Sequence, residues 1–255
     1  MKMHHLFSPE GEAALAALLQ QRPLLAFDFD GTLTPIVARP GDARLAPGVS
    51  ARLAALAALL PVAIVSGRSV EDVRGRLGFV PQFIVGNHGA EEAGPPAAAT
   101  GHAGALSPLR ARLIEARSAL AAAGVTVEDK GHSVALHYRL SRHRELAQRV
   151  IGEVLAGLDE TLRVFGGKLV VNVVARLAPD KADAVRALVQ RCGAQAALFV
   201  GDDVNDEPVF ASAPPHWLTV RVGRDDPRSK ARWFLDSQRE VALLLERLLT
   251  LLASP

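Results

Sequence analysis

The chain has 255 residues, of which 49% are hydrophobic and 22% charged, so it can build one large domain or two small ones around a substantial core. The formal net charge is +2 and no long basic run occurs, which argues against a nucleic-acid-binding protein. The single Cys192 excludes an intrachain disulfide and is typical of a reducing compartment. The N-terminus lacks the apolar segment of a signal peptide, and charges interrupt the apolar C-terminal stretch. We expect a soluble, cytoplasmic protein that binds neither nucleic acid nor membrane.

The first hundred residues alternate between helical and strand patterns. Ser8 and Pro9 form a typical helix start, with a capping hydroxyl followed by proline in the first turn. The patterns predict helices at about 10–21, 47–60 and 69–77, and short apolar strands at 24–30, 62–66 and 83–86. This alternation favours a parallel, doubly wound sheet.

The pattern changes after residue 92. Residues 93–106 are rich in Ala, Gly and Pro, which predicts an exposed loop. Beyond them we expect helices at about 107–122 and 142–157, and antiparallel strand pairs at 125–129 with 133–138 and 162–165 with 169–174. A helix from Asp180 and strands at 197–201 and near 217–222 then restore the α/β pattern, and we expect a docked terminal helix at the C-terminus. The expected fold is α/β, a Rossmann-like doubly wound parallel-sheet core (1–101 and 179–255) with an inserted α+β cap domain (102–178).

The most informative motif is the segment DFDGTLT, which begins at Asp28, where the first parallel strand should end. Ligands of open α/β sheets bind at the carboxyl ends of strands. Residues two apart in an extended chain point to the same side, so Asp28 and Asp30 can face one site. One carboxylate could attack phosphorus while the other protonates the leaving oxygen. The alternative is a strand end with two solvated acids, but the preceding apolar strand favours a catalytic site.

A second acidic motif, GDDVNDE from Gly201 to Glu207, also follows an apolar strand. Two acidic clusters at one sheet edge repel each other unless a cation lies between them, and Mg²⁺ suits such an oxygen-rich site, as does Mn²⁺. Asp28 and Asp202 are the predicted direct ligands, together with the backbone carbonyl of Asp30. Asp206 is predicted to orient a metal-bound water, and Asp203 either does the same or braces the loop. Alone, the motif could equally be an acidic helix start.

Two further residues are placed to hold a phosphate group. Ser66 follows the second strand, where its hydroxyl and free backbone N–H groups could bind phosphate oxygens. Lys181 begins a helix and can add a positive charge to the same region. Such residues are often only a helix cap and a solvated lysine, but their positions after core strands favour the phosphate role.

Taken in this order, the four motifs resemble those of the haloacid dehalogenase superfamily of phosphatases. The resemblance covers essentially the whole chain. It implies that Asp28 is the nucleophile and Asp30 the general acid and base. Ser66 resembles the second motif of the superfamily, Lys181 the third, and GDDVNDE the fourth. The insert lies where the superfamily carries its second type of cap.

Within this superfamily the chain looks most like the trehalose-6-phosphate phosphatases, through the segments IVSGRS, NHGAE, VEDKGHSVALHYR and GDDVNDE. The resemblance implies two groups of sugar-binding residues, on the core Arg68, Asn87, His88 and Glu91, and on the cap Glu128, Lys130 and His137. The cap residues could instead belong to an ordinary surface hairpin. The chain departs from the family after GGKLVV, where a glutamate and then an Arg-Pro pair are usual and this chain reads Asn172 to Arg176. In addition, Asn205 replaces a threonine, and Ala182 replaces a glycine.

The expected function is Mg²⁺-dependent hydrolysis of trehalose 6-phosphate through an aspartyl-phosphate, by a monomer. The departures leave open another sugar phosphate, such as sucrose phosphate or a glycosyl-phosphoglycerate, and a phosphomutase is a more distant alternative. A non-catalytic phospho-accepting module is a further class. The module is about half this length and carries an acid after its third strand, where this chain has Asn87 and His88.

Overall fold

The structure is a computed structural model that describes residues 3–37, 39–94 and 101–253. Its internal contacts divide the chain into two compact units. We call Met1–Ala93 with Pro179–Pro255 the core unit and Gly94–Ala178 the cap unit, and describe each separately. Among the described residues, no helix has the length and apolar character needed to cross a bilayer.

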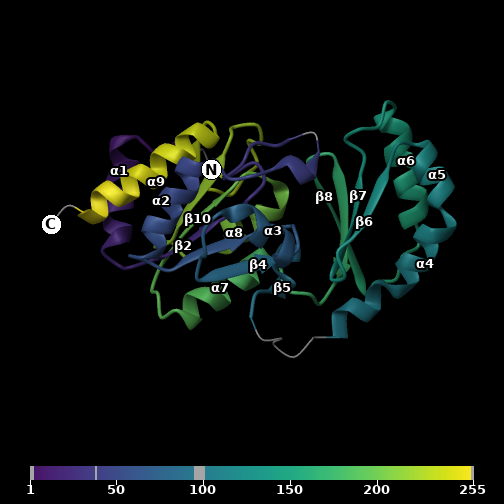
Figure 1. Ribbon diagram of the computed structural model, residues 1–255, viewed down its shortest axis with the longest axis horizontal. Helices are drawn as coiled ribbons and strands as arrows, with labels where there is room; N and C mark the ends of the chain where they lie inside the picture. Colours follow the sequence, from purple (N-terminus) through teal and green to yellow (C-terminus); the bar gives the residue numbers. More distant parts are fainter. Residues whose placement is uncertain (1–2, 38, 95–100, 254–255) are drawn as a thin grey trace. The chain divides into compact units, whose positions relative to one another are not determined.

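The core unit is built on one mostly parallel sheet (Figure 1). In spatial order its strands are β1 (His4–His5), β12 (Trp233–Leu235), β11 (Leu218–Val222), β10 (Ala197–Gly201), β2 (Leu24–Phe27), β3 (Val62–Val65), β4 (Phe83–Gly86) and β5 (Glu91–Glu92). Every neighbouring pair is parallel except β4 and β5. The residues of β2, β3 and β10 are all buried, as expected for strands covered on both faces. The expected mostly parallel α/β core is confirmed.

Helices cover both faces of this sheet. The helices of the core unit are α1 (Pro9–Leu19), α2 (Pro47–Ala57), α3 (Val70–Leu77), α7 (Lys181–Arg191), α8 (Glu207–Ser212) and α9 (Gln238–Ala253). Short 3₁₀ turns lie at Pro40–Asp42, Asn87–Gly89 and Val204–Asp206. Helix α9 packs against α1 and α2, while α7 packs against α8 and lies on the other side of the sheet (Figure 1). The predicted docked terminal helix is thus present, with Leu244, Leu245 and Leu248 buried in the core.

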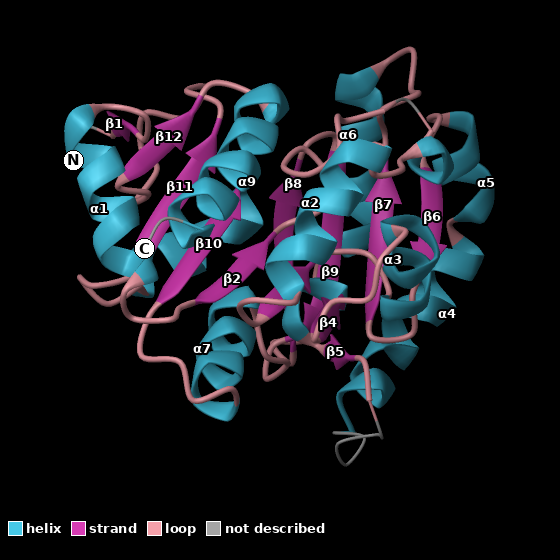
Figure 2. Ribbon diagram, turned by 60° about the vertical axis from the view of Figure 1, so that its left-hand side comes forward, coloured by secondary structure: helices cyan, strands magenta, loops and turns pink. Residues whose placement is uncertain are grey.

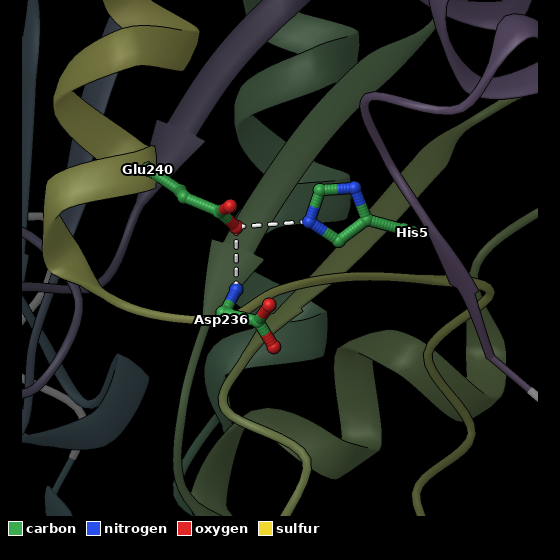
Figure 3. Close-up of side chains that lie close together, drawn as sticks. All are labelled: His5, Asp236 and Glu240. Carbon is green, nitrogen blue, oxygen red and sulfur yellow. Dashed lines mark hydrogen bonds and ion pairs between the residues drawn. The ribbon is translucent and has the colours of Figure 1, made fainter.

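The sequence patterns do not predict three short strands, β1 and β5 at the two edges of the sheet and β12 next to β1, because two or three residues carry no readable periodicity. At one edge, Glu240 at the start of α9 holds β1 in place (Figure 3). Its Oε2 atom lies 3.0 Å from His5 Nε2 and accepts the backbone N–H of Asp236 at 2.6 Å. Glu240 therefore joins the N-terminal strand to the residues that open the last helix.

The cap unit is an α+β unit with an antiparallel sheet, visible at the right of Figure 1. Its strands, in spatial order, are β6 (Thr126–Asp129), β7 (Ser133–His137), β9 (Val170–Ala175) and β8 (Leu162–Gly167). Its helices are α4 (Ser107–Glu115), α5 (Arg117–Ala122) and α6 (Arg144–Leu155), preceded by a 3₁₀ helix at Gly101–Leu106. Figure 2 shows the strands of the chain in magenta and these helices in cyan.

Two local predictions for the cap unit need correction. The single helix expected over 107–122 is two helices that meet at Ala116, whose backbone departs from helical geometry. The loop expected over 93–106 falls partly on residues 95–100, which lie outside the described residues. Its last part is instead a 3₁₀ helix, because Leu106 is buried in the hydrophobic core of the cap unit.

Candidate active site

The site is built around Asp28, directly after β2 at the centre of the core sheet. The backbone N–H of Asp28 still donates to Val200 of β10, at 2.9 Å, so the strand geometry holds its backbone in place. Asp202 follows β10 and Ser66 follows β3, the two strands that flank β2. Because parallel strands end at the same edge of a sheet, this topology brings the sequence motifs to one edge.

Lys181 is the first residue of α7 and lies among these acids. Its Nζ donates to Asp28 Oδ1 and to Asp206 Oδ1, both at 2.7 Å, and the residue is 1% exposed. The side chain of Asp180 caps the helix by accepting the N–H groups of Ala182 and Asp183, which fixes the first turn. Lys181 is therefore a buried cation held between two carboxylates, and not a solvated lysine.

The pKa values of Lys181 and Asp28 are both raised, but for different reasons. Burial works to lower the pKa of Lys181, but the charges of Asp206 and Asp28 outweigh it, so that pKa lies above its ordinary value. Burial raises the pKa of Asp28 well above its ordinary value, and the charges of Asp206 and Asp202 add to the rise against the effect of Lys181. The negative charge of this cluster is therefore only partly balanced by the protein itself.

The acidic cluster has the composition of a divalent-cation site. Asp28, Asp202 and Asp206 each offer one carboxylate oxygen, all within 4.8 Å of one another, and all three are buried. Lys181 is bonded to Asp28 and Asp206 within this group. Three buried carboxylates that offer only oxygen ligands fit a hard cation such as Mg²⁺.

The loop after β10 is ordered by its own carboxylates. Asp206 Oδ2 accepts the N–H groups of Asp202 and Asp203 at 2.9 and 3.0 Å. Asp203 Oδ1 accepts the N–H of Val204 at 2.8 Å, which corresponds to the bracing alternative of the sequence analysis. Gly201 has no room for a side chain, because an added Cβ would lie 2.4 Å from Asp206 Cγ. Both oxygens of Asp206 are thus engaged, Oδ1 by Lys181 and Oδ2 by the loop backbone.

Gly31 and Thr32 of the first motif lie against Asp202. Gly31 has φ +88°, and a Cβ there would lie 2.1 Å from Asp202 Oδ2, so both backbone conformation and space require glycine. The Thr32 hydroxyl donates to Asp202 Oδ1 at 3.2 Å. The side-chain amide of Gln238, at the start of α9, donates to the carbonyl of Gly31. These contacts fix the position of the first motif against Asp202 of the second.

Asp30 lies against Arg68 and not among the buried acids. Arg68 Nε donates to Asp30 Oδ2 at 2.6 Å and Nη2 to Oδ1 at 2.7 Å, while Nη1 reaches Asp72 at 2.7 Å. Both oxygens of Asp30 are therefore engaged by one guanidinium group. The family resemblance implies a sugar-binding role for Arg68, and the structure adds that Arg68 orients Asp30.

Of the remaining core residues singled out from the sequence, Ser66 follows β3, Asn87 and His88 follow β4, and Glu91 lies in β5. The Ser66 hydroxyl accepts the N–H of Arg68 at 3.2 Å. Asn87 and His88 both have positive φ, +48° and +60°, and the Asn87 side chain donates to Glu91 at 2.7 Å. Glu91 also accepts the N–H of Val70 at 3.0 Å, at the start of α3. Asn87 and Glu91 thus contact each other, and Glu91 contributes to the N-terminal end of α3.

In the cap unit the three expected residues lie together on strands β6 and β7 and the turn between them. Glu128 Oε2 lies 2.9 Å from His137 Nε2 and 3.6 Å from Lys130 Nζ. On the same sheet Asn172 of β9 pairs with Ala135 on one side and Phe165 on the other, and is 3% exposed. The position at which the chain departs from the family is therefore central in this sheet.

Sequence reasoning missed several residues that order the site. Thr32 lies within the first motif, and the one signal for its contact with Asp202 is a hydroxyl two residues after Asp30. Asp72 offered only the weak signal of an acid four residues after Arg68. Gln238 is separated from Gly31 by 207 positions, and no local sequence pattern predicts their contact.

Comparison with known proteins gives the family. The profile of the trehalose-phosphatase family matches residues 26–239. The chain is 32% identical over 259 residues to a trehalose-phosphate phosphatase of Mycolicibacterium paratuberculosis, covering 94% of this chain and 66% of the relative. It is 34% identical over 250 residues to the corresponding enzyme of Mycobacterium tuberculosis, covering 91% of this chain and 62% of that one. The chain thus spans less than two thirds of the length of either relative.

Among solved structures, the C-terminal domain of a trehalose-6-phosphate phosphatase of C. albicans superposes with a TM-score of 0.81 at 21% identity. That match covers 100% of this chain and 99% of the other, and it shows a shared fold. A trehalose-6-phosphate phosphatase related protein superposes with a TM-score of 0.74 at 22% identity, covering 91% of this chain and 100% of that chain. The profile match, the two relatives and the fold agree with the resemblance of the sequence motifs, and this chain belongs to the trehalose-phosphatase family, whose members are phosphomonoester hydrolases of the haloacid dehalogenase superfamily.

Proposed function

We propose that this chain hydrolyses trehalose 6-phosphate to trehalose and phosphate through a phosphorylated Asp28. The observation that carries the proposal is the buried cluster of Asp28, Lys181, Asp202 and Asp206 at the carboxyl edge of the core sheet. Lys181 holds one oxygen of Asp28, and in the described part of the chain no hydrogen bond engages the other. A carboxylate fixed by one oxygen and open at the other is oriented for attack.

In the first step an oxygen of Asp28 forms a bond to phosphorus and the bond from phosphorus to the sugar oxygen breaks. Asp30 gives its proton to the departing oxygen, so trehalose leaves as a neutral alcohol. In the second step Asp30 takes a proton from water, the water oxygen attacks phosphorus, and Asp28 is released with inorganic phosphate. Lys181 and the Ser66 hydroxyl supply positive charge and hydrogen bonding to the phosphoryl oxygens.

The contacts of Asp30 add a requirement to this scheme. Arg68 engages both of its oxygens, so Asp30 must turn at least one of them away from the guanidinium before it can deliver a proton. Arg68 in turn is held by Asp72. Arg68 therefore acts as a positioning residue for the proton transfer, in addition to any contact with the sugar.

The residues present fit Mg²⁺. Asp28, Asp202 and the backbone carbonyl of Asp30 are the ligands we propose, and Mg²⁺ when bound supplies charge neutralisation for the phosphoryl group. Asp206, whose oxygens are engaged by Lys181 and the loop backbone, orders the loop that carries Asp202. Asp203 braces the same loop.

We further propose that residues 102–178 act as a cap domain whose residues Glu128, Lys130 and His137 bind the sugar hydroxyls. On the core side, Arg68, Asn87, His88 and Glu91 are the proposed counterparts. Hydroxyl-rich sugars are bound by charged and amide side chains of this kind. A monomeric state and a cytoplasmic location remain predictions from the sequence.

The test is phosphate release from trehalose 6-phosphate, sucrose 6-phosphate, a glycosyl-phosphoglycerate and glucose 6-phosphate, with Mg²⁺ and with EDTA. We expect strong preference for trehalose 6-phosphate, loss of activity in EDTA, and no turnover by Asp28→Ala, whose fold is checked by circular dichroism. A faster turnover of another ester would mean that a different sugar phosphate is the substrate, and the proposed mechanism would still hold. Full activity of Asp28→Ala would refute the mechanism. Release of a single sugar per chain, with the phosphoryl group retained on the protein, would indicate a phospho-accepting module.

A further inference from the structure

The last acid of the motif GDDVNDE, Glu207, takes no part in the cluster described above. It is the first residue of α8 and directly follows Asp206. Its carboxylate has two partners outside the motif: Arg221 Nη1 donates to Oε1 at 3.2 Å, and the backbone N–H of Lys230 donates to Oε2 at 2.8 Å. Glu207 therefore fastens the end of the acidic loop to β11 and to the segment after it.

Arg221 is an unusual residue for the interior of a parallel sheet. It lies on β11 in register with Gly201 of β10, the residue just before Asp202, and it is 2% exposed. Its second partner, Asp225, is exposed and lies at 3.2 Å. Its Nε is buried and has no hydrogen-bond partner within the described residues. Burying a guanidinium with one N–H unsatisfied costs folding free energy, and the carboxylates of Glu207 and Asp225 offset part of that cost.

The contacts form a chain from Arg221 to the acid cluster. Arg221 holds Glu207, and Glu207 is bonded through the backbone to Asp206. Asp206 in turn fixes the N–H groups of Asp202 and Asp203 and one side of Lys181. A shift of Glu207 would therefore be passed through Asp206 to Asp202 and Lys181, whereas the proposed sugar-binding residues lie outside these contacts.

We propose that Arg221 and Glu207 are a positioning pair that sets the geometry of the acidic loop and so its affinity for Mg²⁺. The inference rests on the proposed function of that loop as a metal site. Residues that orient metal ligands from outside typically change metal affinity by roughly 10- to 100-fold when removed. The expected signature is thus a weakened metal site with an unchanged substrate site.

The experiment measures Mg²⁺ binding by isothermal titration calorimetry in the absence of substrate, on the whole chain. For Glu207→Gln, which keeps the shape and removes the charge, we expect the Kd for Mg²⁺ to rise roughly 10-fold or more. At saturating Mg²⁺ the KM for trehalose 6-phosphate should stay within about twofold of wild type. The matched control is Glu246→Gln, which breaks an exposed pair with Arg52 at 3.1 Å and should leave the Kd unchanged.

A second set of variants tests the pair itself. Arg221→Lys should give an intermediate Kd, since it restores the charge without the forked geometry. The double variant Glu207→Gln with Arg221→Met should be no worse than the poorer single variant, because the two residues act as one unit. If Arg221→Met does not fold, Glu207→Gln alone still decides.

The outcomes separate this inference from the proposed function. A wild-type Kd in Glu207→Gln, with or without a lower thermal midpoint, would show a purely structural pair and overturn the inference alone. Absence of Mg²⁺ binding by the wild-type chain would overturn the inference together with the proposed metal site. A raised KM at saturating Mg²⁺ with an unchanged Kd for Mg²⁺ would mean that Arg221 and Glu207 affect substrate binding and not metal binding, and would also overturn the inference.

Discussion

Replacing Lys181 by methionine is the sharpest test of the buried cluster. The side chain is 1% exposed and donates at 2.7 Å to both Asp28 and Asp206. Methionine keeps most of the volume but removes the cation that is bonded to Asp28 and Asp206 within the cluster of three buried carboxylates. Removing one partner of a buried ion pair typically costs about 3–5 kcal/mol, because the remaining charge is left buried and uncompensated. For a protein of this size that corresponds to a fall in Tm of roughly 6–20 °C.

The loss should depend on pH in a defined direction. Lys181 has a raised pKa, so its own contribution is fully present below the unfolded value of about 10.4 and does not change between pH 5 and 8. The pKa of Asp28 is raised, so the folded state binds its proton more tightly and stability falls as pH rises towards that pKa. Without Lys181 to oppose it, the rise is larger and the fall extends to higher pH. The variant should therefore lose more stability at pH 8 than at pH 5.

Urea unfolding of the metal-free protein, followed by tryptophan fluorescence, reports on the correct unit, because Trp217 and Trp233 both lie in the core unit. The matched control is Arg186→Met on the same helix, where an exposed pair with Asp183 at 3.4 Å should contribute less than about 1 kcal/mol. If Lys181→Met cost no more than Arg186→Met, with no dependence on pH, the account of the buried cluster would be refuted.

Three further changes test other parts of the structure. Gly31→Ala should destabilise the protein by at least about 1 kcal/mol in urea unfolding and weaken Mg²⁺ binding, because Gly31 has a positive φ and lies close to Asp202. The control is Gly152→Ala inside α6, which should stabilise the protein by about 0.5–1 kcal/mol because nothing lies within 4 Å of the added Cβ. Equal effects of the two substitutions would contradict the argument. Arg68→Lys should lower kcat roughly 10- to 100-fold, because the forked grip on Asp30 is lost, while Arg76→Lys, which contacts Asp72 and not Asp30, should remain near wild type in the same phosphate-release assay. Asp129→Asn should cost less than about 1 kcal/mol at pH 7: Arg110 holds the pKa of Asp129 below its ordinary value, so the contribution is present above about pH 3.9 and lost as pH falls through the folded pKa. Thermal unfolding of wild type and Asp129→Asn at pH 7 and pH 3 measures this contribution. A stability difference between the two proteins that is larger at pH 3 than at pH 7 would contradict the prediction.

The sequence by itself determined the elements whose patterns are local. Strands β2, β3, β4 and β10 are short apolar runs with motifs at their carboxyl ends, and a parallel sheet must bring those ends to one edge. That is why Asp28, Asp202 and Ser66 could be expected at one site from the sequence, whereas Lys181, at the start of α7, follows a strand of the cap unit. The same logic predicted the paired strands of the cap unit from their glycine-containing turns.

Only the tertiary structure decided which partner each charged group takes. Nothing local distinguishes a lysine bonded to Asp28 and Asp206 from one that faces solvent, and Arg68 could reach a sugar, a phosphate or Asp30 until the fold placed it. Contacts such as Gln238 with Gly31 or His5 with Glu240 join positions more than 200 residues apart. Short edge strands and the break at Ala116 escaped prediction for a related reason: two or three residues carry too little pattern, and packing, not intrinsic preference, sets their conformation.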